Sequence, residues 1–258
     1  MQHRILTTLI LSFVILFGAL AQEAQPFQKK TLTTSSGFTL PYRELQPLRF
    51  KESKKYPLVV VLHGAGERGT DNEAQLTHGG KMFADPLVRA KYPSFVVFPQ
   101  CPKNRVWYYS PVLKGLHPNP EKDVNLEINA VKELIDQLVA TGNIDTRRIY
   151  ITGLSMGGFG TFGIVSLYPD LFAAAAPICG GAVLGDVPKY AQKLPFWVFH
   201  GSADNVVPPQ LSRDAVQALK EAGGKVKYTE YEGVAHNSWD NVFADPAYLK
   251  WMFKQKRK

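Results

Sequence analysis

Gly153-Leu154-Ser155-Met156-Gly157 follows directly on a strand-like run at residues 148–152 and precedes residues 158–167, which can form a helix. A serine on a sharp turn between a strand and a helix has an exposed hydroxyl, and the amide of the next residue points at the same space. Glycine on either side leaves room for the strand and the helix to close around such a turn. The pentapeptide therefore predicts a nucleophile elbow with Ser155 as the nucleophile, although the same pattern also arises by chance in loops.

Strand-like and helix-like segments alternate along the rest of the chain. Residues 27–33 and 39–45 alternate apolar and polar side chains around a Ser-Ser-Gly turn, which predicts a hairpin. Later strand-like runs lie at 58–62, 95–98, 149–152, 173–178, 196–199 and 226–231, and helical patterns lie at 123–140, 210–222 and 245–253. This repetition predicts an α/β fold with a mostly parallel central sheet and helices on both faces.

The loops after two later strand runs supply an acid and a base. Asp204 follows the run at 196–199, and His236 follows the run at 226–231. Because active sites of parallel sheets lie at the carboxyl ends of the strands, these side chains are expected to meet Ser155 there. A serine hydroxyl needs a base to take its proton, and an acid holds that base in the right tautomer. The sequence therefore predicts a Ser155–His236–Asp204 catalytic triad.

Other interpretations of these residues stay open when each is taken alone. The positions of Asp204 and His236 are each also consistent with an ordinary loop residue that has no catalytic role. His200, immediately at the end of its strand run, is a rival base, although we expect its ring to satisfy backbone groups. It is the joint occurrence of the three residue types, in this order and at strand ends, that favours the triad.

A loop of small residues follows the first buried strand run, in the stretch His63-Gly64-Ala65-Gly66. Acyl transfer needs two backbone N–H donors aimed at the oxygen on which negative charge develops. The small residues of this stretch let the backbone approach a substrate closely. We assign the amides of Ala65 and Met156 to this oxyanion hole, with Gly66 as an alternate, and expect His63 to brace the loop.

The first 21 residues have the pattern of a secretory signal peptide: a positive charge at Arg4, an apolar run, and the small-residue cleavage pattern Ala19-Leu20-Ala21. The apolar run is shorter than the ~20 residues that a membrane span needs, although an uncleaved anchor is the alternative. We expect residues 22–258 to form a single domain that is secreted or periplasmic, with no stable membrane association after cleavage.

The formal net charge of +8 comes from scattered basic residues, with one dense cluster at the C-terminal tail. A solvated basic surface is the simplest interpretation, and attraction to acidic polymers is the alternative. The sequence carries no nucleic-acid motif. It also has no clustered His, Cys and carboxylate spacing of the kind that binds a metal, so neither a metal nor a cofactor is expected.

The two cysteines, Cys101 and Cys179, follow strand runs that we expect not to be adjacent. A gap of three strands would separate them by about 14 Å, which is beyond the reach of a disulfide. Loops could close that gap, but we expect free thiols.

Several stretches of the chain occur together in one known group of proteins. They are His63-Gly64-Ala65-Gly66-Glu67-Arg68-Gly69, Pro99-Gln100-Cys101-Pro102, the stretch from Ile144-Asp145 through Ser155-Met156-Gly157-Gly158, Pro177-Ile178-Cys179-Gly180-Gly181 and His236-Asn237-Ser238-Trp239. With them the chain resembles the α/β-hydrolase superfamily, and within it the bacterial "predicted peptidase" and esterase group related to carbohydrate esterases and polyhydroxybutyrate depolymerases. The resemblance implies the α/β-hydrolase fold and a Ser155, Asp204, His236 triad. Because members include feruloyl and acetyl-xylan esterases, it also implies esters on plant polysaccharides as substrates.

Two loops bear on the substrate. Residues 179–194 lie where lipase-like relatives carry a cap, but they are too few to build one, so we expect an open site with no large cap domain. The loop at 101–122 contains Trp107, whose ring either offers a flat surface to a sugar or phenolic substrate or packs the loop onto the domain. Trp239, close to His236, is expected to wall the acyl pocket.

Together these features predict an exported serine esterase that cleaves carboxylic esters, including those borne by polysaccharides or linked to phenols. A serine peptidase with the same triad and a non-catalytic carbohydrate-binding relative are the alternatives. The sequence leaves the acyl group, the alcohol and the oligomeric state open.

Overall fold

The computed structural model describes residues 26–110, 113, 115 and 125–258. The signal peptide predicted for residues 1–21, and much of the second half of the loop predicted at 101–122, lie outside the described residues. Within the described part, eight strands form one sheet in the order β1-β2-β4-β3-β5-β6-β7-β8. The strands are β1 (Phe27–Thr33), β2 (Thr39–Leu45), β3 (Tyr56–Leu62), β4 (Phe95–Pro99), β5 (Ile144–Leu154), β6 (Ala174–Ile178), β7 (Phe196–Gly201) and β8 (Val226–Tyr231).

The sheet is antiparallel only where the N-terminal hairpin joins it. Strands β1 and β2 pair antiparallel, as do β2 and β4, and every other neighbouring pair is parallel. All residues of β3, β4, β6 and β7 are buried. Strands that are covered on both faces carry apolar side chains continuously, which is why these strands appear as unbroken apolar runs in the sequence. The predicted mostly parallel sheet is confirmed.

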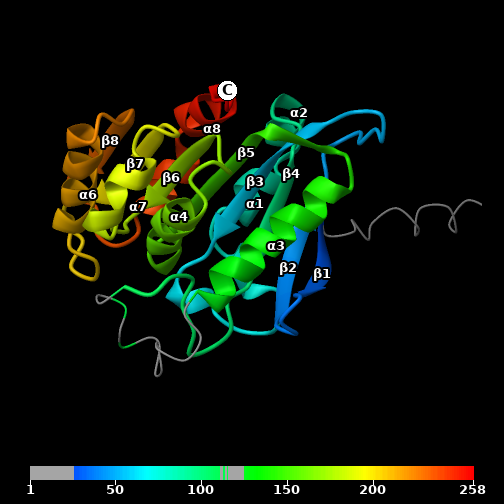
Figure 1. Ribbon diagram of the computed structural model, residues 1–258, viewed down its shortest axis with the longest axis horizontal. Coiled ribbons are helices and arrows are strands. Elements are labelled where there is room, and N and C mark those ends of the chain that lie inside the picture. The colour runs from blue at the N-terminus through cyan, green and yellow to red at the C-terminus, as the bar shows by residue number, and fades with distance from the viewer. Residues whose placement is uncertain (1–25, 111–112, 114, 116–124) are drawn as a thin grey trace, which may run out of the picture.

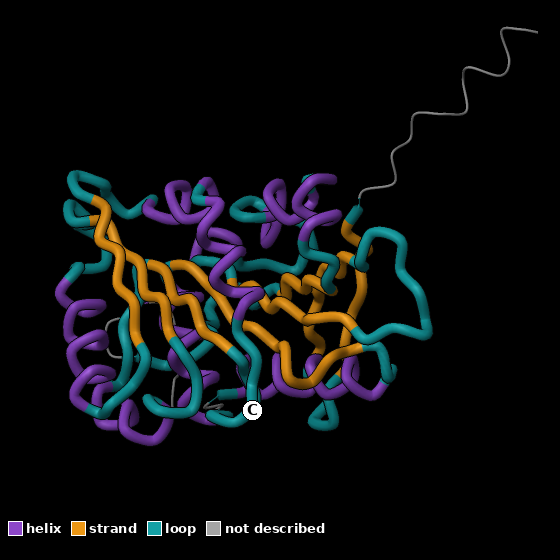
Figure 2. Tube along the Cα trace, turned by 90° about the horizontal axis from the view of Figure 1, so that it is seen from above, coloured by secondary structure: helices purple, strands orange, loops and turns teal. Residues whose placement is uncertain are grey.

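Helices cover both faces of the sheet (Figures 1 and 2). The helices are α1 (Gly80–Ala84), α2 (Pro86–Lys91), α3 (Leu126–Ala140), α4 (Met156–Leu167), α5 (Val187–Tyr190), α6 (Gln210–Glu221), α7 (Ser238–Ala244) and α8 (Pro246–Lys254). One core cluster joins α3, α4, α5 and α6 to the sheet, and a second joins α1, α7 and α8 to the opposite face. The predicted helices on both faces are thus confirmed.

Helix α3 shows why the helical pattern could be found in the sequence. Its residues at three- and four-residue spacing are buried against the sheet: Ile128, Val131, Leu134, Ile135 and Leu138. A stripe of this kind is the signature of a helix with one face in the core. Helix α6 is followed by Gly223 at φ +75° and by a hydrogen bond from Gly224 N to the Leu219 carbonyl, as expected of the Gly-Gly stop signal.

The connection between β6 and β7 is short. It contains only a 3-10 turn, η4 (Leu184–Asp186), and α5. No large cap domain is therefore built there, as the sequence predicts. Among the residues that the structure describes, none of the helices combines the length and the apolar character that crossing a bilayer requires.

Candidate active site

Ser155 occupies the tight turn between β5 and α4. Its backbone has φ 53° and ψ −117°, a left-handed conformation that is strained for a residue other than glycine. A β-carbon on Gly153 would lie 2.3 Å from the Gly157 carbonyl oxygen, and one on Gly157 would lie 2.0 Å from the Leu62 carbonyl oxygen. The two glycines are therefore needed by the packing of β5, β3 and α4 around the serine.

His236 lies between Ser155 and Asp204. Its Nε2 is 2.9 Å from Ser155 Oγ, and its Nδ1 is 2.7 Å from Asp204 Oδ2. The three residues follow β5, β7 and β8, so the carboxyl ends of three parallel strands bring together groups that are far apart in the sequence. The distances are those that transfer of a proton from the serine to an oriented imidazole requires.

Asp204 is held as a carboxylate by its neighbours. Its Oδ1 accepts hydrogen bonds from the backbone N–H groups of Val206 and Val207, both at 2.9 Å. Burial by itself would raise the pKa of Asp204, but the hydrogen bonds from His236 and from these two amides outweigh it and lower the pKa. The carboxylate is therefore ionised when it faces the His236 ring.

His200, the rival candidate for the catalytic base, has a structural role. It is fully buried, with Nδ1 2.7 Å from Ser212 Oγ and Nε2 2.9 Å from the Val207 carbonyl oxygen. Since a carbonyl only accepts, Nε2 carries the proton. Burial lowers the pKa of His200 and keeps the ring neutral. Its Nε2 also lies 3.3 Å from Asp204 Oδ2, so the ring packs behind the carboxylate.

The two amides assigned to the oxyanion hole both begin helices. Ala65 is the first residue of a 3-10 turn, η1 (Ala65–Glu67), and Met156 is the first residue of α4. The first N–H groups of a helix have no partner inside the helix and are free to bind an anion. Neither helix has a side-chain cap that would occupy these donors. The positive end of the α4 dipole adds to the attraction for negative charge.

His63 fixes the direction of the Ala65 amide. The backbone N–H of Cys101 donates to His63 Nε2 at 2.9 Å, so the ring proton is on Nδ1, which donates to the Gly64 carbonyl at 2.6 Å. In a trans peptide the carbonyl of one residue and the N–H of the next point in opposite directions. Holding the Gly64 carbonyl on one side therefore turns the Ala65 N–H to the other, and the expected bracing role of His63 has a specific geometry.

Trp107 does not lie where a substrate could reach it. Its side chain is completely buried, its Nε1 donates to the His63 carbonyl at 3.0 Å, and its ring packs edge-on against the His63 ring at 5.0 Å. Its β-carbon also fills the space beside Gly160 of α4. Of the two interpretations of Trp107, contact with substrate is wrong, and the ring packs the loop onto the domain. Through His63 it also supports the loop to which the oxyanion hole is assigned.

Trp239 is half-buried beside the base. Its ring lies edge-on to the His236 ring, with 5.3 Å between centroids. On its other side it meets His78 at 5.0 Å, and His78 Nε2 is 3.6 Å from Glu67 Oε1. Trp239, His78 and Glu67 thus form one wall next to His236. His78 was not predicted, because it lies in an irregular stretch after η2 (Ala74–Leu76) with no pattern that ties it to the later loops.

The neutral state of His63 has a consequence for stability. Burial lowers the pKa of His63 to about 4, and the unfolded chain would have a value near 6.5. Between pH 4 and pH ~6.5 the unfolded chain binds more protons at His63 than the folded protein does. The contribution of His63 to the stability of the fold is therefore complete above pH ~6.5 and is lost as pH falls toward 4. We expect the free energy of unfolding to drop by about 3 kcal/mol from this group between pH 7 and pH 4.

Urea unfolding of the wild type and of His63→Asn at both pH values measures this contribution. Asparagine keeps a donor close to the position of Nδ1 but does not titrate. The variant is expected to be less stable at pH 7 and to lose less stability on acidification than the wild type. An equal loss in the two proteins would contradict a buried neutral His63.

Cysteine and carboxylate side chains near the triad raise the question of a metal. Atoms of Cys179, Asp204 and His236 that could act as ligands lie within 4.8 Å of one another. However, burial raises the pKa of the Cys179 thiol to about 12, and the short hydrogen bond to His236 already occupies the Asp204 Oδ2 atom. The donor set fits a triad with a protonated thiol packed beside it better than a metal centre. Cys101 and Cys179 are both buried and unpaired with each other, as the spacing of their strands predicts.

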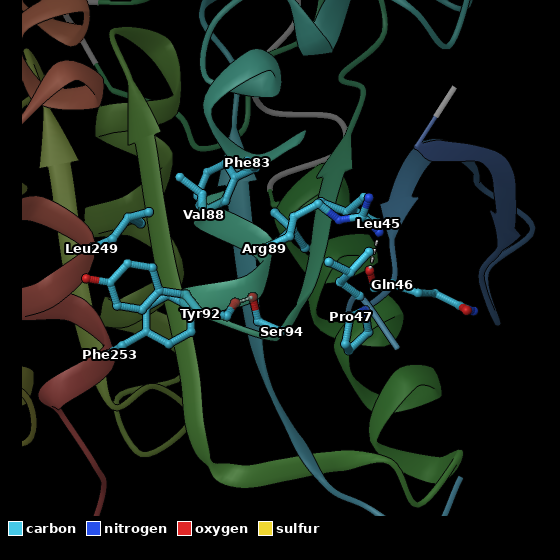
Figure 3. A pocket seen from close by; sticks show the side chains of 12 residues that line it. Leu45, Gln46, Pro47, Phe83, Val88, Arg89, Tyr92, Ser94, Leu249 and Phe253 are labelled. Carbon is cyan, nitrogen blue, oxygen red and sulfur yellow. Dashed lines mark hydrogen bonds between the residues drawn. The ribbon is translucent and has the colours of Figure 1, made fainter. Parts of the chain in front are cut away.

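The well-formed cavity in Figure 3 is not a substrate site. It lies between the end of β2, helix α2 and helix α8, and its lining includes Leu45, Arg89, Tyr92 and Phe253. Its volume is only about 10 Å³, which is room for about one water molecule. None of the triad residues lines it.

A mostly parallel sheet with a serine at the strand–helix elbow, and with an acid and a histidine after later strands, defines the α/β-hydrolase class of proteins. The chain matches the family model described as Phospholipase/Carboxylesterase over residues 47–247, and it belongs to that family. It is accordingly a carboxylic ester hydrolase, in agreement with the esterases to which it is similar.

Three similar proteins illustrate the relationship. Carboxylesterase SOBER1 of Arabidopsis thaliana is 30% identical over 196 residues, which are 69% of this chain and 82% of that protein. A thermostable esterase of known crystal structure is 42% identical with a TM-score of 0.82; the match covers 90% of this chain but only 64% of the esterase chain. The bifunctional acetylxylan esterase/xylanase XynS20E of Neocallimastix patriciarum is 34% identical over 109 residues, 40% of this chain and 16% of that protein.

Proposed function

We propose that the protein is an exported serine esterase in which Ser155, His236 and Asp204 cleave esters carried by carbohydrates or phenols. The observation that carries the proposal is the position of His236, whose two ring nitrogens lie 2.9 Å from Ser155 Oγ and 2.7 Å from Asp204 Oδ2. This geometry supports an imidazole that accepts the serine proton while a carboxylate stabilises the resulting cation.

Acylation follows from the contacts of the three side chains. Ser155 Oγ attacks the ester carbonyl carbon while His236 Nε2 takes its proton. The carbonyl oxygen becomes an oxyanion and receives hydrogen bonds from the Ala65 and Met156 amides. His236 then donates the proton to the departing alcohol oxygen, and the acyl group stays on Ser155.

Deacylation uses the same groups in the reverse order. Water takes the place of the alcohol, His236 removes its proton, and the hydroxide adds to the acyl carbon. The second tetrahedral intermediate collapses with return of the proton to Ser155 Oγ, which releases the acid. The proton moves only between Ser155, His236 and the bound alcohol or water, so each step balances with the residues of the triad.

Three features support a substrate larger than a simple alkyl ester. The short connection between β6 and β7 carries no cap, the Trp239 ring offers an aromatic surface next to His236, and the chain is similar to an acetylxylan esterase/xylanase. An uncapped site with an aromatic wall suits esters on a sugar polymer or on a phenolic ring. The signal-like residues 1–21 support the proposed export, since such polymers lie outside the cell.

The proposed function is tested with one panel of substrates: acetylated xylan, methyl ferulate, p-nitrophenyl acetate, a long-chain p-nitrophenyl ester and a peptide p-nitroanilide. We expect kcat/KM to be higher on the first two than on the long-chain ester, and no turnover of the amide. Strong activation by long-chain ester micelles would contradict an open carbohydrate esterase site. Efficient amide cleavage would favour the peptidase alternative.

Trp239 is predicted to determine the preference for esters with an aromatic acyl group, because it is expected to wall the acyl pocket. Truncation in Trp239→Ala should raise KM for methyl ferulate by about fivefold, because an aromatic contact of this kind contributes roughly 1 kcal/mol. KM for p-nitrophenyl acetate and kcat for both should change less than about threefold, since an acetyl group is too small to need this wall. Trp251→Ala, on α8, serves as the matched control. Equal losses on both esters would show that Trp239 instead holds His236 in place.

A further inference from the structure

A basic pocket lies at the edge of the sheet opposite to the triad. Five cationic side chains line it: Lys193, Lys225, Lys256, Arg257 and Lys258. Its lining residues Ala173, Pro195 and Lys225 directly precede β6, β7 and β8, whereas the triad lies beyond the carboxyl ends of strands. The pocket has a volume of about 440 Å³, in the range of small-molecule binding sites. In Figure 1 the C-terminus, which contributes three of the cations, lies beside α8.

The charge of the basic pocket is not neutralised from within. Asp170 is the one acidic side chain among its described lining residues, and it is already paired with Lys193 at 3.1 Å. Over the described residues, no carboxylate forms an ion pair with Lys225, Lys256 or Arg257. Asp145, which interacts electrostatically with Lys256, is itself paired with Arg148. Several like charges around one hollow repel one another, and an anion that enters the hollow removes that repulsion.

Arg257 is held in position rather than free in solvent. Its guanidinium donates to the main-chain carbonyls of Asp170 and Thr146, and its backbone N–H donates to the Arg147 carbonyl at 2.9 Å. Its Nε is buried within the described residues and does not face the pocket, so a carboxylate would bind the N–H groups that remain on Nη1 and Nη2. Because the guanidinium is already fixed by main-chain carbonyls, this binding costs less side-chain entropy than binding by a mobile arginine.

The other groups of the basic pocket suit a sugar acid. Gln192 and Gln255 also line it, and each anchors its Nε2 on a main-chain carbonyl, that of Ala222 and of Trp251 respectively. Their amide oxygens are acceptors for hydroxyl groups. None of the described lining residues is aromatic, so the pocket lacks the stacking surface with which proteins hold single-stranded nucleic acid.

We propose that the basic pocket binds the carboxylate-bearing sugars of an acidic polysaccharide. The cations receive the carboxylate, the glutamine oxygens receive hydroxyl groups, and the polymer is held on the face remote from Ser155 while esters elsewhere on it reach the triad. The choice of a polysaccharide as partner rests on the proposed function, but the binding of uronate does not depend on catalysis.

Binding of oligogalacturonate and of xylohexaose by isothermal titration calorimetry at low salt tests the proposal. The wild type and Ser155→Ala are expected to bind oligogalacturonate equally and xylohexaose not at all, with an affinity that falls as salt is added. The triple variant Lys193→Gln/Lys225→Gln/Lys256→Gln is expected to raise Kd for oligogalacturonate by about tenfold or more.

A matched triple variant distinguishes an effect of the basic pocket from an effect of the net charge of the protein. Lys51, Lys81 and Lys91 are exposed lysines outside the pocket, and replacing all three with glutamine removes the same charge. This control is expected to change Kd less than about twofold. Equal weakening in the two triple variants would overturn the proposal, and so would tighter binding of inorganic polyphosphate than of oligogalacturonate. Ser155→Ala is inactive under the proposed mechanism, so binding of oligogalacturonate by that variant tests the basic pocket independently of esterase activity.

Discussion

Replacement of Ser155 by alanine is expected to lower kcat on p-nitrophenyl acetate by about 10⁴-fold or more, with the fold intact. The hydroxyl that His236 Nε2 faces at 2.9 Å is the proposed nucleophile, and without it no acyl-enzyme can form. The oxyanion donors and the binding surface remain, so a small residual rate above that of water is expected. Steady-state kinetics together with urea unfolding measures both parts of the prediction. Alanine at residue 155 should not destabilise the protein, because it removes only one partly exposed hydroxyl.

The matched control for this experiment is Ser166→Ala on α4, the helix that follows Ser155. Ser166 Oγ donates to the Gly163 carbonyl and has no contact with the triad, so kcat should stay within about twofold of the wild type. A folded Ser155→Ala protein that retains a tenth of the wild-type rate would contradict the serine mechanism. Asp204→Asn extends the test, since an amide cannot stabilise the imidazolium, and kcat should fall by on the order of 10⁴-fold.

The strands and the long helices could be predicted because their physical causes are local. The apolar runs of β3 and β4 reflect burial on both faces, and the stripe on α3 reflects packing of one face. The short helices α1, α2, α5 and α7 were not predicted. They have between four and seven residues, too few for a helical period to stand out from the sequence. Helices of that length are held by tertiary packing rather than by their own propensity.

Of the candidate site, only the residues that directly follow strands could be predicted from the sequence. Ser155, Asp204 and His236 each follow a strand, so the topology of a parallel sheet brings them together. The place of Trp107 could not be predicted, since an aromatic residue in a loop fits a binding surface and a packed interior equally well. Two contacts place Trp107 in the interior: its Nε1–H donates to the His63 carbonyl, and Gly160 leaves room for its side chain. Neither contact has a signature in the sequence.

Replacement of Gly157 by alanine is expected to destabilise the protein by about 3 kcal/mol or more and to abolish most of the activity. The new β-carbon would lie 2.0 Å from the Leu62 carbonyl oxygen, 2.6 Å from the Leu62 carbonyl carbon and 2.8 Å from the His63 carbonyl oxygen. All three contacts are with backbone in or next to the buried strand β3, so no side chain can rotate away to relieve them. Either β3 or the first turn of α4 must move.

Both movements would displace the proposed oxyanion hole. The His63 and Gly64 peptides lead directly to the Ala65 amide, and Met156 immediately precedes residue 157, so a shift on either side changes the distance between the two donors. Urea unfolding and steady-state kinetics of Gly157→Ala measure the two losses, with Gly185→Ala as the control because a β-carbon at that exposed position would meet nothing within 4 Å. A Gly157→Ala protein with wild-type stability would show that β3 and α4 are farther apart than the structure places them. Gly157, two residues after the serine, is thus expected to serve the strand and the oxyanion hole at once, because the backbone of Leu62 and His63 limits how closely the helix can approach the sheet.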